Sequence, residues 1–174
     1  YVSAEAIRVM GLEKEGSKII TCHLGNGSSM AAVKDGKCFD TSMGLTPLEG
    51  VPMGTRCGNV DPAVVEFIAN LENITVSETL AMLNKKSGVL AVSGVSSDFR
   101  DLDAAAEKGN DRAKLAIDMF TYDVKKYIGA YAAAMGGVDG IVFTAGIGEN
   151  SASIREACVE GLEFMGVKLD KEAN

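Results

Sequence analysis

Two glycines in a short polar loop are the first residues of this sequence that could do chemistry. Residues 23–29 read His-Leu-Gly-Asn-Gly-Ser-Ser. Glycines let backbone N–H groups approach a phosphate closely, and the serine hydroxyls add further donors. Asn26-Gly27 is equally typical of a two-residue hairpin turn, so both interpretations stay open. The loop lacks the Gly-Lys-Ser/Thr ending of a P-loop, which excludes that class of nucleotide site.

A single histidine, His23, adjoins this loop. A lone histidine at the end of a strand commonly serves as a hydrogen-bonded structural residue. Its place beside the glycines also suits a group that contacts a ligand. The sequence leaves both roles open.

Arg56 lies between two glycines in Met53-Gly-Thr-Arg-Cys-Gly58. Its planar, permanently charged guanidinium can bind a phosphate or carboxylate through two parallel hydrogen bonds. Such a group suits the stabilisation of charge on a transferring phosphoryl group. The alternative is an arginine that simply lies on the surface.

Two further segments combine polar residues with helix boundaries. Ser97-Asp98-Phe99-Arg100 reads as a helix N-cap, or as a nucleotide contact in which Asp98 accepts from a ribose or amine and Arg100 stacks on a base. Gly146-Ile-Gly-Glu-Asn150 follows an apolar run and opens a helical pattern, but Ser151 replaces the third glycine of GxGxxG. Glu149 would repel a pyrophosphate, so a ribose or adenine neighbour, or a plain strand-to-helix turn, fits this segment better.

Three short strands are expected to position the first loop. Lys18–Leu24, Ser28–Val33 and Lys37–Met43 are short runs bounded by turn residues. Asp35-Gly36 between the last two is a hairpin signal, so the three strands form an antiparallel meander. The glycine- and proline-rich segment from Gly44 to Gly58 is predicted to be a long loop.

Helical patterns occupy most of the remaining chain. Asp61-Pro62 is expected to begin one helix, which carries an apolar stripe, and Thr75 with Glu78 forms a capping box for the next. Asp139–Ala145 reads as a buried strand. The apolar stripe of the first of these helices consists of Val64, Val65, Phe67, Ile68 and Leu71. Further helices are predicted from Asp98 through Ala106, over Asn110–Met135 and after Ser151. Between them, Gly88–Gly94 is an apolar stretch interrupted by glycines. This order predicts one mixed α/β domain over residues 1–174, whose sheet joins the meander to a parallel strand through a helical crossover.

The composition excludes several classes of protein. With 174 residues and 47% apolar residues, the chain can bury a core. Seventeen basic against 24 acidic residues give a net charge of −7, which argues against nucleic acid as a partner. No apolar run reaches the roughly 18 residues of a membrane span, so no membrane partner is expected. Four cysteines without a CxxC pair, and no secretory leader, indicate reduced thiols in the cytoplasm.

Taken together, the motifs of this chain resemble those of the acetate kinase (acetokinase) family. The resemblance covers essentially all of residues 1–174 and implies a ribonuclease H-like domain of the superfamily of actin, sugar kinases and heat-shock ATPases. The chain is similar to most of the C-terminal, nucleotide-binding domain of a two-domain kinase. The motifs are His-Leu-Gly-Asn-Gly-Ser-Ser, Asp-Thr-Ser-Met-Gly-Leu-Thr-Pro-Leu-Glu-Gly, Met-Gly-Thr-Arg-Cys-Gly-Asn-Val-Asp-Pro, Asp-Phe-Arg and Phe-Thr-Ala-Gly-Ile-Gly-Glu-Asn.

The resemblance implies an activity and a set of site residues. Acetate kinases transfer a phosphoryl group between ATP and acetate, giving acetyl phosphate and ADP, with Mg²⁺. By position, Arg56 matches the arginine that stabilises the transition state. The residues matching nucleotide-contacting positions are His23, Leu24, Gly25, Asn26, Gly27, Asp98, Phe99, Arg100, Gly146, Ile147, Gly148, Glu149 and Asn150. Family members are homodimers, so the same is expected here.

The departures from the family pattern matter as well. Another transition-state histidine, the Mg²⁺ ligand, the acetate-binding arginine, a catalytic aspartate and a closing strand and helix are all expected outside this chain. We therefore expect a piece of a longer protein that has no appreciable turnover alone. Propionate or butyrate kinase is the close alternative, and a module that only binds nucleotide or dimerises is a second. A Rossmann-type dehydrogenase rests only on Gly146-Ile147-Gly148 and the strand before it.

Overall fold

A computed structural model describes all residues from 1 to 174. The chain divides into two compact units: residues 1–42 with 121–174, and residues 43–120. Helix α6 (Asp111–Met135) contributes residues to both. The prediction of a single domain over residues 1–174 stays a prediction.

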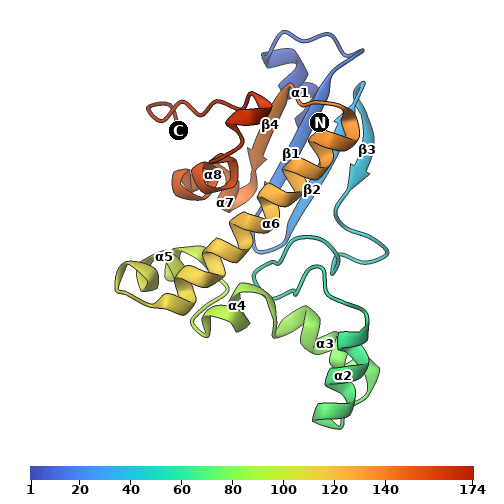
Figure 1. Ribbon diagram of the computed structural model, residues 1–174, viewed down its shortest axis with the longest axis vertical. Coiled ribbons are helices and arrows are strands. Elements are labelled where there is room, and N and C mark those ends of the chain that lie inside the picture. Colours follow the sequence, from blue (N-terminus) through green and yellow to red (C-terminus); the bar gives the residue numbers. More distant parts are fainter. The chain divides into compact units, whose positions relative to one another are not determined.

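The first unit is built on a four-stranded sheet with the order β3-β2-β1-β4 (Figure 1). The strands β1 (Lys18–Leu24), β2 (Ser28–Lys34) and β3 (Lys37–Thr41) form the predicted antiparallel meander. The strand β4 (Gly140–Thr144) pairs with β1 in parallel, as predicted. The mixed sheet and its parallel strand are therefore confirmed.

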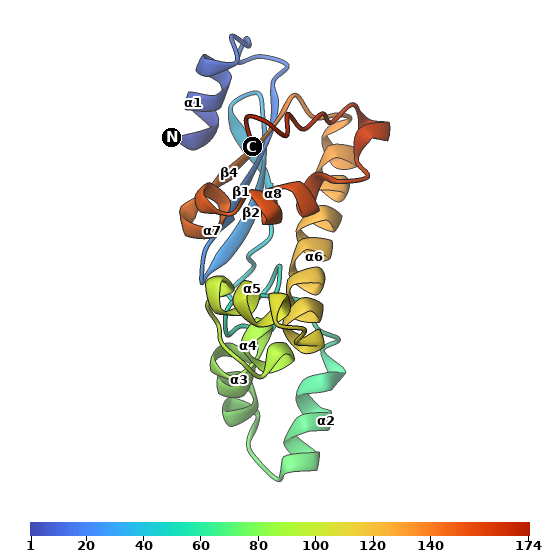
Figure 2. The same ribbon diagram turned by 90° about the vertical axis from the view of Figure 1, so that its left-hand side faces the viewer.

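Helices cover both faces of this sheet. Figure 2 shows α1 (Val2–Val9) and α7 (Ala145–Asn150) on one side of the strands and the C-terminal part of α6 on the other. The central strand β1 is largely buried, with Ile19, Ile20, Cys22 and Leu24 all inaccessible to solvent. The edge strand β3 is exposed throughout. The unit ends in α8 (Ala152–Val159) and the 3₁₀ turn η1 (Glu163–Met165).

Two elements of this unit differ from the sequence prediction. The helix α1 was not predicted; a single buried residue, Ile7, packs it against Ile19 and Val33, which is too weak a pattern to identify a helix. The strand β4 was expected to be buried, but all five of its residues are half-buried. It lies at the end of the strand order, so only one of its edges is paired.

The second unit is a long loop followed by helices. Residues 43–62 contain no helix or strand, as predicted. The helices are α2 (Ala63–Glu72), α3 (Val76–Lys85), α4 (Gly88–Ser93), α5 (Phe99–Glu107) and the first part of α6. The short helix α4 lies in the stretch that the sequence identified only as apolar and glycine-punctuated. The capping box of α3 and the Asp98 N-cap of α5 are both present.

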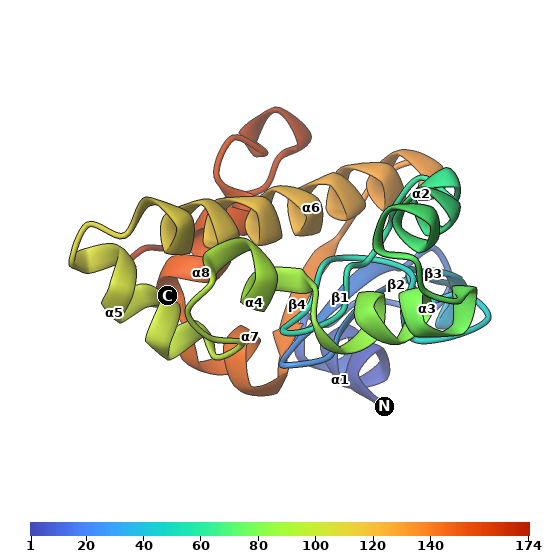
Figure 3. The ribbon, with the colours of Figure 1, turned by 90° about the horizontal axis from the view of Figure 1, so that it is seen from below.

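The apolar stripe of α2 is not buried within this chain. The helix packs beside α3 (Figure 3), but none of its residues is buried, and Phe67 and Leu71 are 65% and 67% exposed. Periodicity identifies an apolar face correctly without showing that another element covers it. Pro62 takes the N-cap position in place of Asp61, whose carboxylate still accepts from the Ala63 N–H at 2.9 Å.

No helix combines the length and the continuous apolar character that spanning a membrane requires.

The capping box gives a test of the local fold. We expect Thr75→Ala to lower the free energy of unfolding by about 1 kcal/mol, because the Thr75 hydroxyl accepts from the Glu78 N–H at 3.2 Å. Urea unfolding followed by circular dichroism measures this. Ser77→Ala is the control, because Ser77 is exposed and lies in the same first turn of α3. Equal losses in both variants would show that the cap contributes nothing.

Candidate functional site

The first glycine loop is not a standard two-residue hairpin turn. Such a turn of type I′ requires positive φ at both central residues, and neither Asn26 nor Gly27 has one. Asp35 and Gly36, which join β2 to β3, do have it, at 55° and 67°. The two-residue turn interpretation of Asn26-Gly27 is therefore wrong, since residues 25–27 connect β1 to β2 as a three-residue hairpin loop. The prediction for Asp35-Gly36 is confirmed.

Internal hydrogen bonds hold the 24–28 turn. The Gly25 N–H donates to the Gly27 carbonyl at 3.2 Å, and the Ser28 hydroxyl donates to the Gly25 carbonyl at 3.0 Å. A Cβ at Gly25 would lie 3.3 Å from the Gly27 oxygen and 3.6 Å from Ala145 Cβ, so glycine is needed for close packing. Leu24 is fully buried and holds the start of the loop in the core. Asn26 is exposed.

The second glycine segment meets the first at one edge of the sheet. In the parallel β1–β4 register, His23 lies opposite Thr144, and His23 Nδ1 is 3.1 Å from Thr144 Oγ1. The helix α7 follows β4 directly and contacts both strands (Figure 1). Gly148 is buried against them: a Cβ there would lie 3.3 Å from the Phe143 carbonyl carbon and 3.6 Å from the Cys22 oxygen.

The turn into α7 has an unusual backbone. Ala145 has φ +65°, a left-handed conformation that costs a non-glycine residue roughly 1 kcal/mol or more. The Glu149 carboxylate reaches back to accept from the Ala145 N–H at 3.1 Å, and the Asn150 amide donates to the Gly146 carbonyl at 2.8 Å. The segment 146–150 thus belongs to the short helix α7. The side chain of Glu149, near the end of this helix, caps the N–H of its first residue.

Arg155 of α8 fixes the far end of α7. Its Nη1 donates to the carbonyls of Gly148 and Glu149 at 3.0 and 2.9 Å. The same guanidinium reaches the side chain and the carbonyl of Asn174. These bonds satisfy carbonyls that the end of a helix leaves unpaired. Arg155 therefore sets where Gly148 and Glu149 lie.

In the second unit, Arg56 stands on a tightly bonded loop. Its Nη1 donates to the Pro47 carbonyl at 3.3 Å, and none of the ion pairs of the chain involves it. Its side chain is half-buried. A permanent cation without a carboxylate partner retains its capacity to bind an anion.

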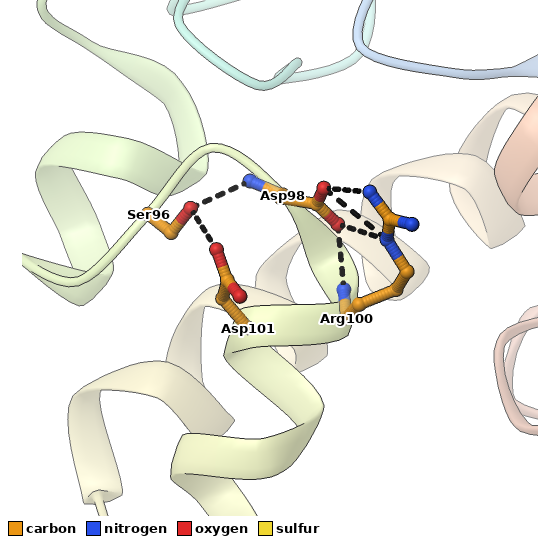
Figure 4. Close-up of polar contacts among 4 residues, drawn as sticks. All are labelled: Ser96, Asp98, Arg100 and Asp101. Atoms are coloured by element: carbon orange, nitrogen blue, oxygen red, sulfur yellow. Dashed lines mark hydrogen bonds and ion pairs between the residues drawn. The ribbon is translucent and has the colours of Figure 1, made fainter.

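Asp98 and Arg100 form an exposed ion pair at the start of α5 (Figure 4). Asp98 Oδ1 accepts from the Arg100 backbone N–H at 2.9 Å, and Arg100 Nη2 lies 2.6 Å from Asp98 Oδ2. The Arg100 side chain and then its N–H lower the pKa of Asp98 to about 2. Ser96 closes the network by accepting from the Asp98 N–H and donating to Asp101 at 2.7 Å. Phe99 is buried and packs against Phe120, with ring centroids 4.6 Å apart and the rings tilted by 60°, so it anchors the segment.

The predicted site residues therefore fall into two sets. His23–Gly27 and Gly146–Asn150 meet within the first unit, whereas Arg56 and Asp98–Arg100 belong to the second. No group of three or more His, Cys, Asp or Glu residues could hold a metal ion. All four cysteines are free thiols.

Comparison with known proteins identifies the family. The family model described as "Acetokinase family" matches residues 1–174. The chain belongs to the acetokinase family. It is 61% identical to an acetate kinase of Methanosarcina barkeri over its whole length, and spans 43% of that relative. The chain thus covers less than half the length of the curated relatives it matches.

Solved structures of this family share the fold. A crystal structure of Porphyromonas gingivalis acetate kinase is 52% identical, with a TM-score of 0.97 over 99% of this chain and 43% of that one. A propionate kinase from Francisella tularensis is 43% identical, with a TM-score of 0.92 over 99% of this chain and 44% of that one. These likenesses confirm the predicted α/β fold of the actin, sugar kinase and heat-shock ATPase superfamily.

Sequence reasoning missed three residues that shape the site. Thr144 partners His23, Ala145 carries the left-handed turn, and Arg155 fixes α7. Thr144 could have been found only by predicting that β4 pairs with β1 in a register that places it opposite His23. Nothing in the sequence marks Ala145 as left-handed or Arg155 as different from other helix-borne arginines.

The ion pair at α5 gives a pH-dependent prediction. A carboxylate whose pKa is depressed in the folded state stabilises that state above its unfolded pKa, near 3.9, and this stabilisation is lost as the pH falls toward 2. We expect Arg100→Ala to raise the pKa of Asp98 without restoring its ordinary value, because the residue 100 N–H still donates. Carbon-detected NMR titration measures it. Lys126→Ala should leave the Asp98 titration unchanged; an unaltered titration in Arg100→Ala would contradict the assignment.

Proposed function

We propose that this chain is most of the C-terminal, nucleotide-binding domain of a longer acetate kinase. In the proposed reaction, an acetate oxygen bonds to the γ-phosphorus of ATP as the bond from that phosphorus to the ADP oxygen breaks, giving acetyl phosphate and ADP. The observation that carries the proposal is the meeting of two glycine segments, 23–27 and 146–150, at one edge of the sheet. Family membership supports the choice of reaction.

The first-unit residues are proposed to hold the nucleotide. The backbone of Gly25 and Gly27 and the exposed side chains of His23 and Asn26 line one loop, where glycine permits close approach to phosphate oxygens. The buried Leu24 is proposed to hold this loop in place from the core. Gly146, Ile147, Gly148, Glu149 and Asn150 form the second wall. Because Glu149 carries a negative charge, this wall suits the ribose or the base better than the phosphates.

The residues of the second unit are proposed to have roles of their own in nucleotide binding and phosphoryl transfer. The Asp98 carboxylate can accept from a ribose hydroxyl or a base amine, and the largely exposed Arg100 guanidinium can stack on the base. Phe99 positions this pair from the core. Arg56 is proposed to stabilise the charge of the transferring phosphoryl group, since phosphoryl transfer depends on positioning and charge neutralisation more than on covalent chemistry.

Further parts of the proposal concern what the rest of the protein supplies. Mg²⁺ is proposed to accompany the nucleotide, and the residues of this chain do not themselves form a metal site. The longer protein is proposed to be a cytoplasmic homodimer that also binds acetate and acetyl phosphate. A propionate kinase is the second candidate function, favoured by the Francisella tularensis neighbour. Relative rates of the longer protein on acetate, propionate and butyrate distinguish the two.

Removing the Arg56 cation tests the catalytic assignment. In the longer protein, we expect Arg56→Ala to lower kcat by about 10³-fold, because charge on the transferring group loses its counter-charge. The Kd for MgADP should stay within about threefold. A coupled ATP–acetate assay and calorimetry measure both, with the exposed Arg8→Ala as the control. Full turnover in Arg56→Ala would overturn its role, and the 174-residue chain alone should show no appreciable turnover.

Nucleotide binding separates the kinase from a purely assembling module. We expect MgADP to bind the longer protein and Arg100→Ala to weaken that binding by about tenfold, since the stacked guanidinium is lost. Isothermal titration calorimetry measures this, and Lys126→Ala serves as the control. A stable dimer without any nucleotide binding would favour the non-catalytic alternative.

A further inference from the structure

The loop that carries Arg56 is docked by its backbone onto the segment between α3 and α4. The N–H groups of Ser87, Val89 and Leu90 donate to the carbonyls of Thr55, Met53 and Gly54 at 2.9, 2.9 and 3.0 Å. In the opposite direction, the Cys57 N–H donates to the Leu83 carbonyl at 2.9 Å. Four main-chain bonds thus fix the residues on both sides of Arg56.

Two more bonds tighten the loop. The Met53 N–H donates to the carbonyl of Arg56 itself at 3.0 Å, which closes the turn. The Thr55 hydroxyl donates to the Asn84 carbonyl at 3.0 Å. Met53 is also fully buried. The backbone that carries the guanidinium is therefore held as firmly as an element of secondary structure, although it lies in a long loop.

Gly88 is the point of closest approach in this docking. It has φ +61° and is buried at the beginning of α4. A Cβ there would lie 2.1 Å from the Met53 oxygen, 2.7 Å from the Arg56 oxygen and 3.1 Å from the Arg56 nitrogen. Real Cβ atoms do not approach backbone this closely, so any side chain at 88 displaces the loop.

We infer that Gly88, through the docking of residues 53–57 on residues 83–90, is a positioning residue for Arg56. The inference rests on the proposed function, in which Arg56 faces the transferring phosphoryl group. An error of about 1 Å in the position of such a group can cost about 10²-fold in rate. The docking of residues 53–57 on residues 83–90 thus determines the position of the Arg56 guanidinium, although Gly88 itself does not contact the nucleotide.

Gly94 provides a matched control at the other end of the same helix. It is the C-cap of α4 with φ +66°, close to that of Gly88, but a Cβ there would meet nothing nearer than 3.9 Å. Alanine at either position has the same backbone strain. Only at position 88 does the methyl group collide with the Arg56 loop.

The experiment compares Gly88→Ala, Gly94→Ala, Arg56→Ala and the Gly88→Ala/Arg56→Ala double variant in the longer protein. We expect Gly88→Ala to lower kcat by about 10²-fold, with the MgADP Kd within about threefold of wild type. Gly94→Ala should keep kcat within about threefold. The double variant should be no slower than Arg56→Ala alone, because a residue that acts through Arg56 has no effect once Arg56 is gone.

Thr55→Val keeps the test decisive if Gly88→Ala fails to fold. It removes only the hydroxyl bond to the Asn84 carbonyl, and we expect a several-fold loss of kcat at constant MgADP affinity. Three outcomes would overturn the inference and leave the proposed function intact. The first is an unchanged kcat in Gly88→Ala or, if that variant fails to fold, in Thr55→Val. The second is an equal loss of kcat in Gly88→Ala and Gly94→Ala, and the third is additive losses in the double variant. A fully active Arg56→Ala would overturn both the role of Arg56 and this inference, whereas a wild-type protein without kinase activity would overturn the proposed function.

Discussion

The parallel pairing of β1 with β4 is the constraint on which the rest of the first unit depends. Parallel strands end at the same edge of a sheet, so the loops that follow Leu24 and Thr144 emerge together although about 120 residues separate them in sequence. The antiparallel β1–β2 pairing returns the chain after three residues, which keeps the first loop short. One strand thus brings two distant glycine segments side by side.

Rigidity at this edge comes from contacts that are local to each turn. Glu149 and Arg155 bind opposite ends of the six-residue helix α7, one accepting from an N–H and the other donating to carbonyls. In the second unit, main-chain hydrogen bonds likewise fix the loop of residues 53–57 to the end of α3 and the start of α4. In both places, satisfied main-chain groups replace the regular ladder of a longer helix or strand.

Local patterns predicted the elements well, and long-range relations less well. The Asp35-Gly36 hairpin, the capping box at Thr75 and the long helix ending before Gly136 follow from turn, cap and propensity chemistry that is confined to a few residues. The same rule left Asn26-Gly27 open, and the chain joins β1 to β2 there through a three-residue loop without positive φ. Local patterns also did not show that the α2 stripe stays exposed or that α1 forms, since burial depends on which other elements lie nearby. For the site, motif resemblance supplied residue types, but the partners Thr144, Arg155 and Gly88 became visible only in three dimensions.

The left-handed Ala145 has a consequence for how this turn can vary. Glycine would adopt φ +65° without steric cost, yet it would also gain conformational freedom that alanine lacks. A Cβ built on Gly25 would lie 3.6 Å from the Ala145 Cβ, so the Ala145 methyl group lies beside the first loop. A sequence optimised only for thermal stability would remove this residue, whereas one optimised for a stiff junction would retain it.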